Sequence, residues 1–245
     1  MSFSFAGVFA DAAALWRGER DLLLRVAGVF FLLPILGVVL LLSMLELPDD
    51  ATADQLRAAV AAFYQANLGA VLLANLTINF GSFAVLNLFL QGGGRTLGEV
   101  LKSTLRRFLP FLAIDVVAGL LFALGASLFL LPGLFALSRT WLAAPAFAAD
   151  PGKGVIDAFR QGWRRSGGFG WIVIAGAASL TLVAALLAIL IAGTVLGVVS
   201  GLVGGGEPIM IVANLVTASI GALAWTALAV MRVSFYRLSE PKQGI

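Results

Sequence analysis

The longest uncharged apolar run of the chain extends from Phe169 to Val203, and it restricts what the protein can fold into. As a helix the run would be about 50 Å long, whereas the hydrocarbon core of a bilayer is only ~30 Å thick. The run must therefore tilt strongly, break, or continue along the membrane surface. Small residues at four-residue spacing mark the expected place of a break, and they also predict a close-packing face within the bundle or between protomers. These residues are Gly193, Gly197 and Gly201.

Other apolar segments of the chain also approach membrane length, and the composition agrees with a lipid environment. Hydrophobic residues make up 60% of the chain and charged residues 12%, against about 25% charged residues in soluble domains. A soluble protein of this size could not bury so much apolar surface. We therefore predict an all-α integral membrane bundle with six transmembrane helices, in a single domain over residues 1–245. The expected spans cover residues 23–45, 68–90, 109–131, 134–149, 169–192 and 209–231.

Four amphipathic segments are expected to form helices on the membrane surface, at residues 4–17, 52–66, 96–107 and 154–165. The second of these begins with Thr52 and Gln55, which have the spacing of a capping box. The other three share apolar or small residues at i, i+4 and i+8, then an arginine, then a span. We interpret them as three copies of one unit, although any amphipathic entry helix has such a face. The matching positions are Val8, Ala12, Trp16 and Arg17; Leu97, Leu101, Leu105 and Arg106; and Val155, Phe159, Trp163 and Arg164.

The placement of charges predicts the orientation of the spans. Apart from Arg57 and Arg139, all lysines and arginines fall within residues 17–25, 95–107, 153–165 and 232–242. Six spans place these four segments on one side of the membrane. Because cytoplasmic segments carry an excess of lysine and arginine, both termini are expected in the cytoplasm. The opposite side would hold Arg57 with Glu46, Asp49, Asp50, Asp54 and Glu207.

A central pattern of the chain resembles a known group of membrane proteins. It consists of Arg139, the Ala-Ala-Pro-Ala at 143–146, residues 154–158, and the basic stretch 161–166. It is similar to the membrane domain attached to some bacterial glycerophosphodiester phosphodiesterases, and to the YciC-type inner-membrane proteins. The two ends of the chain, Phe3–Ala6 with Trp16-Arg17 and Phe235–Leu238, are similar to the ends of that family. The resemblance implies a bacterial inner (plasma) membrane protein and no agreed activity, and the accompanying soluble phosphodiesterase does not occur in residues 1–245.

Two charged residues lie within expected spans and are candidates for structural or functional roles. A charge in hydrocarbon costs a few kcal/mol, so Asp115 is expected to face protein or water. A structural ion pair with Arg232 or Arg25 is favoured over a functional carboxylate. Arg139 follows the Pro132-Gly133 turn signal and is expected about 9 Å inside the outer end of its span. There it would either reach outward to the headgroups or meet an asparagine amide.

The asparagines that could meet Arg139 lie on two spans, as Asn75 and Asn79 on one and Asn214 on another. Such polar faces either form hydrogen bonds between helices or line a cavity for a lipid or solute, and the former is commoner. Histidine and cysteine are absent, which removes imidazole and thiolate chemistry and the usual zinc ligands. We therefore expect no catalytic residue, metal or cofactor, and an intramembrane enzyme is the weakest of three hypotheses.

The preferred hypothesis is a non-enzymatic inner-membrane protein in envelope or lipid homeostasis, working through its basic cytoplasmic face. The alternative is a small transporter or lipid-handling protein with a polar intramembrane cavity. The expected partners are membrane lipids with anionic headgroups, with a second copy or another protein as further possibilities. Nucleic acid is not expected, because the basic helices are apolar on their other face. The candidate lipid contacts are Arg17, Arg106, Arg107, Arg164 and Arg165.

Overall fold

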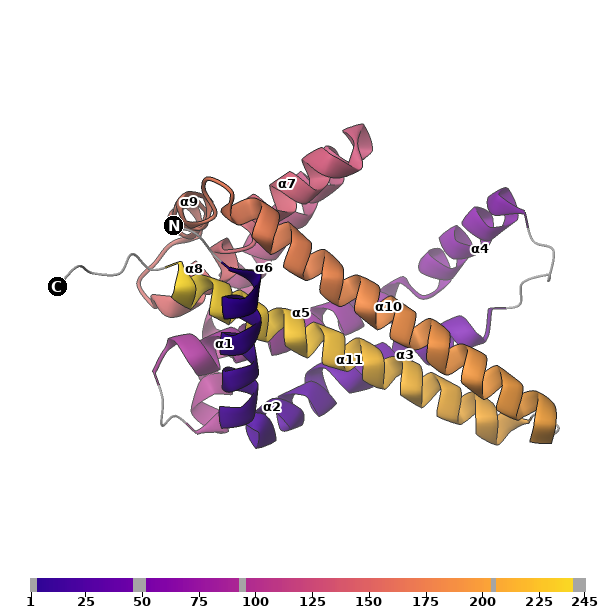
Figure 1. The fold of residues 1–245 in the computed structure, drawn as a ribbon. Helices are drawn as coiled ribbons and strands as arrows, with labels where there is room; N and C mark the ends of the chain where they lie inside the picture. Colours follow the sequence, from indigo (N-terminus) through magenta and orange to yellow (C-terminus); the bar gives the residue numbers. More distant parts are fainter. Residues whose placement is uncertain (1–3, 46–51, 93–95, 204–205, 240–245) are drawn as a thin grey trace.

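The computed structural model describes residues 4–45, 52–92, 96–203 and 206–239, and every regular element within these ranges is a helix (Figure 1). The predicted all-α class is thereby confirmed for the described residues. Several charged residues that entered the predicted charge asymmetry lie outside these ranges, namely Glu46, Asp49, Asp50, Arg95 and Lys242.

Five helices of the described chain are long and apolar enough to cross a membrane, where six were expected. The first is the continuous stretch from Arg20 to Ser43. The other four are α5 (Leu68–Leu90), α6 (Leu97–Leu128), α10 (Gly170–Val203) and α11 (Glu207–Leu238). The 34 residues of α10 form one unbroken helix, so the break considered at its glycines does not occur. These helices are compatible with a multi-pass membrane protein.

The first stretch contains α2 (Arg20–Ala27), a π-helical turn (Gly28–Leu32) and α3 (Leu33–Ser43). In the π turn the N–H of Leu33 bonds to the carbonyl of Gly28. Pro34 follows immediately, and a proline has no N–H and its ring crowds the preceding turn. The widened turn accommodates this proline, so the helix stays continuous.

The expected span 134–149 is not one helix, and this prediction was wrong. The segment is divided between α7 (Leu130–Thr140) and α8 (Ala143–Ala149). Pro145 gives the reason, because a proline ring clashes with the carbonyl four residues earlier, which here belongs to Trp141. The helix therefore ends near Trp141, and Pro145 lies in the first turn of the new helix α8, where proline is tolerated.

The turn before α7 also lies earlier than the sequence suggested. Phe129, with an extended backbone, is the single residue between α6 and α7. Pro132 and Gly133 fall instead within the first turn of α7. The two helices approach closely here, since a Cβ added to Gly125 would lie only 2.7 Å from the backbone nitrogen of Gly133. Glycine at both positions thus permits a tight α6–α7 hairpin.

The expected surface helix at 96–107 is not separate from its span, because α6 passes through Pro110 without interruption. The three units of the proposed repeat consequently differ at their junctions. Helix α1 (Phe5–Gly18) meets α2 at Glu19, α6 is continuous, and α9 (Val155–Arg165) is followed by a short loop before α10. The repeat therefore stays a prediction that the structure does not confirm.

Helix α4 (Ala53–Ala66) begins as predicted. The Gln55 backbone N–H donates to the Thr52 hydroxyl at 3.3 Å, and the Thr52 N–H donates to the Gln55 side chain at 2.8 Å, which completes the capping box. At the opposite end of the molecule, α8 is packed among α5, α6, α9 and α11. Residues 143–148 are all buried, and they form the centre of the larger hydrophobic core.

Candidate functional site

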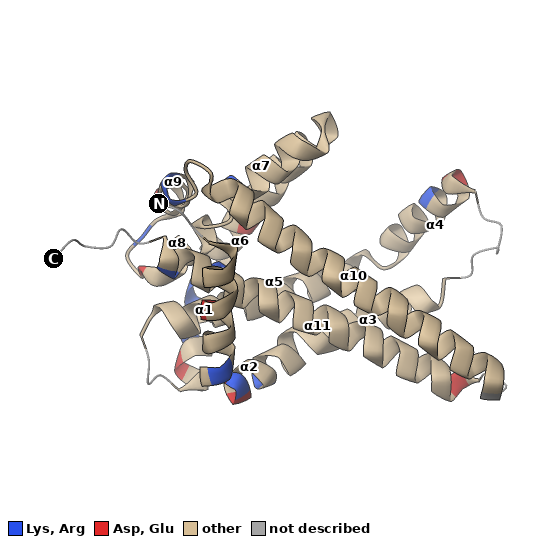
Figure 2. Cartoon of the chain, in the orientation of Figure 1, with Lys and Arg blue, Asp and Glu red and all other residues tan. Residues whose placement is uncertain are grey.

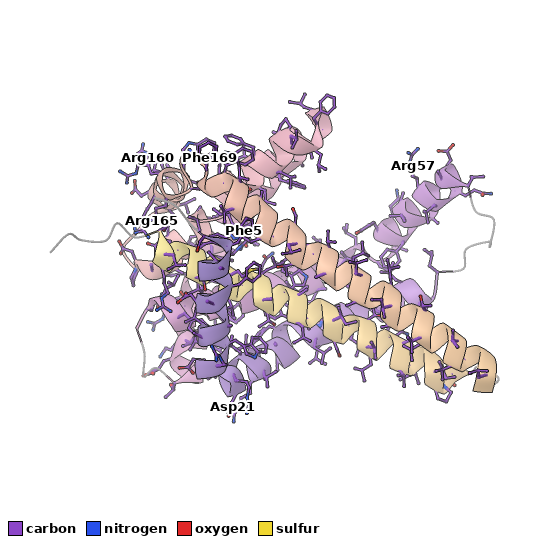
Figure 3. The ribbon with its side chains drawn as sticks, viewed as in Figure 1. Phe5, Asp21, Arg57, Arg160, Arg165 and Phe169 are labelled. Carbon is purple, nitrogen blue, oxygen red and sulfur yellow. The ribbon has the colours of Figure 1, made fainter. Side chains whose placement is uncertain are left out.

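Most lysines and arginines of the described chain gather at one end of the molecule, around α1, α2, α8 and α9 (Figure 2). We call this region the basic end. Asp11 of α1 and Arg237 near the end of α11 form an ion pair there at 3.9 Å, so the first and last helices meet at the basic end. Arg57 lies far from it on α4, where it pairs with Asp54 at 3.2 Å (Figure 3).

The buried helix α8 is held in place by polar side chains from two neighbouring helices. Arg107 of α6 donates to the carbonyls of Phe147 and Lys153, each at 3.1 Å, and its guanidinium lies 3.9 Å from the centre of the Phe147 ring. Gln91 at the end of α5 donates to the carbonyl of Ala148 at 3.1 Å. The last carbonyls of a helix have no partner within it, so these contacts satisfy groups that would otherwise be buried and unpaired.

A buried amide network connects the same helices. Asn87 is fully buried, and its amide donates to the Thr104 hydroxyl at 2.9 Å. The Gln91 amide donates to the Asn87 carbonyl oxygen at 2.8 Å. Sequence reasoning missed Asn87, Gln91 and Thr104. The spacing of Asn87 and Gln91, one helical turn apart at the end of an apolar helix, is the signal that could have found two of them.

Arg165 forms a corresponding contact between α9 and α11. Its guanidinium donates to the Tyr236 carbonyl at 3.1 Å and to the Ser239 hydroxyl at 3.3 Å, and lies 4.0 Å from the Tyr236 ring centre. Arg107 and Arg165 were both expected to contact lipid. In the structure both guanidinium groups donate to protein carbonyls, because the ends of α8 and α11 bring those acceptors within reach, and both residues stay half-buried.

The other three candidate lipid contacts, Arg17, Arg106 and Arg164, are exposed. Each borders a shallow groove or faces solvent at the basic end. A groove of about 440 Å³ is lined by Arg17 and its neighbours up to Arg25. Another of about 270 Å³ is lined by Lys102, Arg106 and Arg107 with Glu99 and Ser103. The largest, about 1030 Å³, runs along α9 and combines basic with acidic side chains: Lys153, Arg160 and Arg164 with Asp150 and Asp157.

Asp115 pairs with Arg232, which was one of its two expected partners. The two side chains are 3.8 Å apart, and each is 18% exposed. The Arg232 guanidinium also lies 4.3 Å from the ring centre of Trp141. The adjacent Ile114 and Met231 belong to the core, and none of the grooves described above is lined by Asp115. The pair therefore joins α6 and α11 at the junction between α7 and α8.

Arg139 does not lie near the asparagines, which corrects its expected surroundings. Its guanidinium lies 4.4 Å from the ring centre of Trp163 and 5.9 Å from that of Phe135. The Ser166 hydroxyl donates to the Arg139 carbonyl at 3.1 Å. The early turn at Phe129 explains the difference, because ten residues of α7 then carry Arg139 about 15 Å back from the turn. Arg139 consequently reaches the end of α9.

The three asparagines are not brought together. The Asn214 amide of α11 forms a long hydrogen bond of 3.5 Å to the Ser43 hydroxyl at the end of α3. On α5, Asn75 is exposed and Asn79 is half-buried, and neither forms a side-chain hydrogen bond within the described residues. Asn214 thus takes the interhelical role expected of such residues, while the other two do not join it in a shared polar face.

Comparisons of the chain with protein-family models, with curated proteins and with solved structures found no match. The resemblance to the phosphodiesterase-associated membrane domain and to the YciC-type proteins therefore stays a prediction from the sequence.

Proposed function

We propose that the protein is a non-enzymatic multi-pass protein of the bacterial inner membrane, with both termini in the cytoplasm, whose basic end binds anionic lipid headgroups. Its role would lie in envelope or lipid homeostasis. The observation that carries this proposal is the division among the arginines of the basic end. Arg107 and Arg165 hold helices together, whereas Arg17, Arg106 and Arg164 stay exposed. Exposed cations beside membrane-length helices are placed to meet headgroups, at about 1 kcal/mol per residue.

The test compares the two ends of the molecule. The protein and a variant with Arg17, Arg106 and Arg164 all changed to Gln would be purified from membranes containing phosphatidylglycerol and phosphatidylcholine. The ratio of the two copurifying lipids would then be measured by mass spectrometry. We expect the triple variant to lose the enrichment of phosphatidylglycerol by about a hundredfold, at about 1 kcal/mol per arginine. Arg57→Gln, at the opposite end, serves as the control and should leave the ratio unchanged. An unchanged ratio in the triple variant would refute the proposal.

A small transporter or lipid-handling protein is the second candidate. An apolar groove of about 510 Å³ between α3 and α5, lined by residues such as Leu33, Pro34 and Thr77, is the observation that favours it, since such a groove has room for an acyl chain. We expect purified protein in liposomes to show no solute uptake and no turnover of phospholipids or glycerophosphodiesters. A robust flux that disappears in Asp115→Asn would favour this second candidate over the first.

A further inference from the structure

Arg139, which is half-buried, differs from Arg107, Arg165 and Arg232 because its guanidinium contacts aromatic rings but, within the described residues, no acceptor or carboxylate. Arg107 and Arg165 donate to carbonyls, and Arg232 pairs with Asp115. Within the described residues, the Arg139 guanidinium donates no hydrogen bond and pairs with no carboxylate, and its Nε atom is buried without an acceptor. A buried donor without an acceptor costs about 1–3 kcal/mol, and more when the group is charged. A cation with one buried donor that lacks an acceptor is suited to binding an anion.

The surroundings of Arg139 add further positive character. The loop from Ser166 to Phe169 leads into α10, and a Cβ on Gly167 would lie 3.7 Å from the Arg139 Nη1 atom. The long helix α10 therefore begins close to the guanidinium, and the N-terminus of a helix carries a partial positive charge. The N–H groups of Gly168 and Phe169 form no backbone hydrogen bond within the described residues. Two positive features brought together in this way favour an anion between them.

An aromatic rim lies beside the Arg139 guanidinium. Phe135 contacts both Trp163 and Trp171 edge to face, with ring centres 6.1 and 5.2 Å apart. Phe169 is 83% exposed at the start of α10, beside α9 with its labelled Arg160 (Figure 3). Tryptophans are enriched where hydrocarbon meets headgroups. The rim therefore offers apolar surface to a glycerol backbone and acyl chain directly beside a cation.

We infer that Arg139, the Ser166–Phe169 loop and the Trp163 ring form a specific site for the phosphate of an anionic phospholipid. This inference rests on the proposed function. It adds to the general preference of the basic end for anionic lipids one defined site at which a single lipid phosphate binds. A planar guanidinium can donate two parallel hydrogen bonds to a phosphate. Trp163 keeps the guanidinium oriented from one side, and the Ser166 hydroxyl fixes the Arg139 backbone against the loop.

The test measures tightly bound lipid separately from general enrichment. Protein purified from membranes of phosphatidylglycerol and phosphatidylcholine is washed extensively in detergent, and the lipid that remains is counted per protein by native mass spectrometry. We expect phosphatidylglycerol to remain bound to the wild type, and Arg139→Gln to reduce its occupancy about tenfold or more, through loss of charge-assisted hydrogen bonds. Arg139→Lys should retain part of it. Arg160→Gln, an exposed arginine on the neighbouring helix α9 that pairs with Asp157, is the matched control and should retain the bound lipid.

The outcomes separate this inference from the proposed function. Suppose that the Arg17, Arg106 and Arg164 triple variant loses the general enrichment while Arg139→Gln keeps its tightly bound lipid. The specific site at Arg139 is then refuted, and the proposal that the basic end binds anionic headgroups is supported. If the wild type holds no lipid after washing, the specific site is likewise wrong. Displacement of the lipid by soluble glycerol 3-phosphate as readily as by phosphatidylglycerol would show a site for free phosphate esters and would overturn the lipid assignment.

A second measurement does not depend on an Arg139 variant. Tryptophan fluorescence of the protein in liposomes is recorded with brominated phosphatidylglycerol and with brominated phosphatidylcholine as quenchers. We expect stronger quenching by the anionic lipid, and we expect that difference to disappear in Trp163→Phe. Equal quenching by the two lipids, or a difference that survives in Trp163→Phe, would contradict the site.

Discussion

The basic end and the far ends of the long helices are held together by different forces. At the basic end, α8 is buried on all sides, and Arg107, Gln91 and Arg165 donate to backbone carbonyls. At the far ends, the α6–α7 hairpin and the α10–α11 pair point in different directions (Figure 1). Phe129 at the hairpin turn is 78% exposed, and Leu202 on α10 is 81% exposed.

This difference follows from what surrounds each region in a membrane. Lipid tails are as apolar as leucine, so they provide no hydrophobic drive for the far ends to associate. Close packing and hydrogen bonds must then supply the cohesion of a bundle. The far ends have the Gly125–Gly133 approach and the long Asn214–Ser43 hydrogen bond, whereas the buried helix α8 and the arginine–carbonyl bonds belong to the basic end. The basic end is consequently expected to carry most of the conformational stability, while exposed positions at the far ends tolerate substitution.

The largest expected effect comes from adding one methyl group at the basic end. A Cβ on Gly162 would lie 2.5 Å from the backbone nitrogen of Ala143 in α8, and backbone cannot easily move away. We expect Gly162→Ala to destabilise the protein by about 3 kcal/mol through overpacking. The thermal unfolding midpoint of the purified protein in detergent would measure the effect.

Gly197→Ala is the matched control at the far end, because nothing lies within 4 Å of its Cβ position. Alanine is a better helix former than glycine by about 1 kcal/mol, so this variant should be equally or slightly more stable. Similar losses in both variants would contradict the difference between the two regions. A loss confined to Gly197→Ala would indicate that the α10 glycines pack against a second protomer.

Alanine substitutions at Arg107 and at Arg106 test whether these adjacent arginines have different roles. Arg107→Ala leaves the Phe147 and Lys153 carbonyls without their donor, and we expect a loss of about 2 kcal/mol in the free energy of unfolding. Arg106→Ala removes an exposed side chain and should leave unfolding unchanged while lowering phosphatidylglycerol enrichment. Unfolding and copurifying lipid would be measured for both variants, and a reversal of the two results would contradict the assigned roles.

The Asp115–Arg232 pair is expected to have the smallest of the three effects, since both side chains are partly exposed. Asp115→Asn leaves the Arg232 cation without its counter-ion, and a loss of about 1–2 kcal/mol is expected after solvent screening. Adding Arg232→Gln should restore much of this loss. A carboxylate with a functional role would give another result, in which Asp115→Asn is stable but inactive and the second substitution rescues nothing.

Local patterns in the sequence determined the features that depend on neighbouring residues. The apolar runs predicted helices of membrane length, because backbone groups in lipid must be satisfied within a segment. The spacing of Thr52 and Gln55 predicted the start of α4, since both capping bonds form within one turn. The pairing of Asp115 with Arg232 was also foreseen as one of two choices, because few charges lie within the spans.

Only the tertiary structure decided which arginines face protein and which face outward. Arg106 and Arg107 are adjacent and chemically identical, but only Arg107 meets the carbonyl of Phe147, which lies 40 residues further along the chain. That acceptor is available because Pro145 ends one helix and starts the short α8 in the core. The position of Arg139 likewise depends on a turn at Phe129 and on Trp163 of another helix. Hydropathy and charge are local properties of the chain, whereas the partner of a long, flexible cation is set by whichever distant backbone the packing brings within reach.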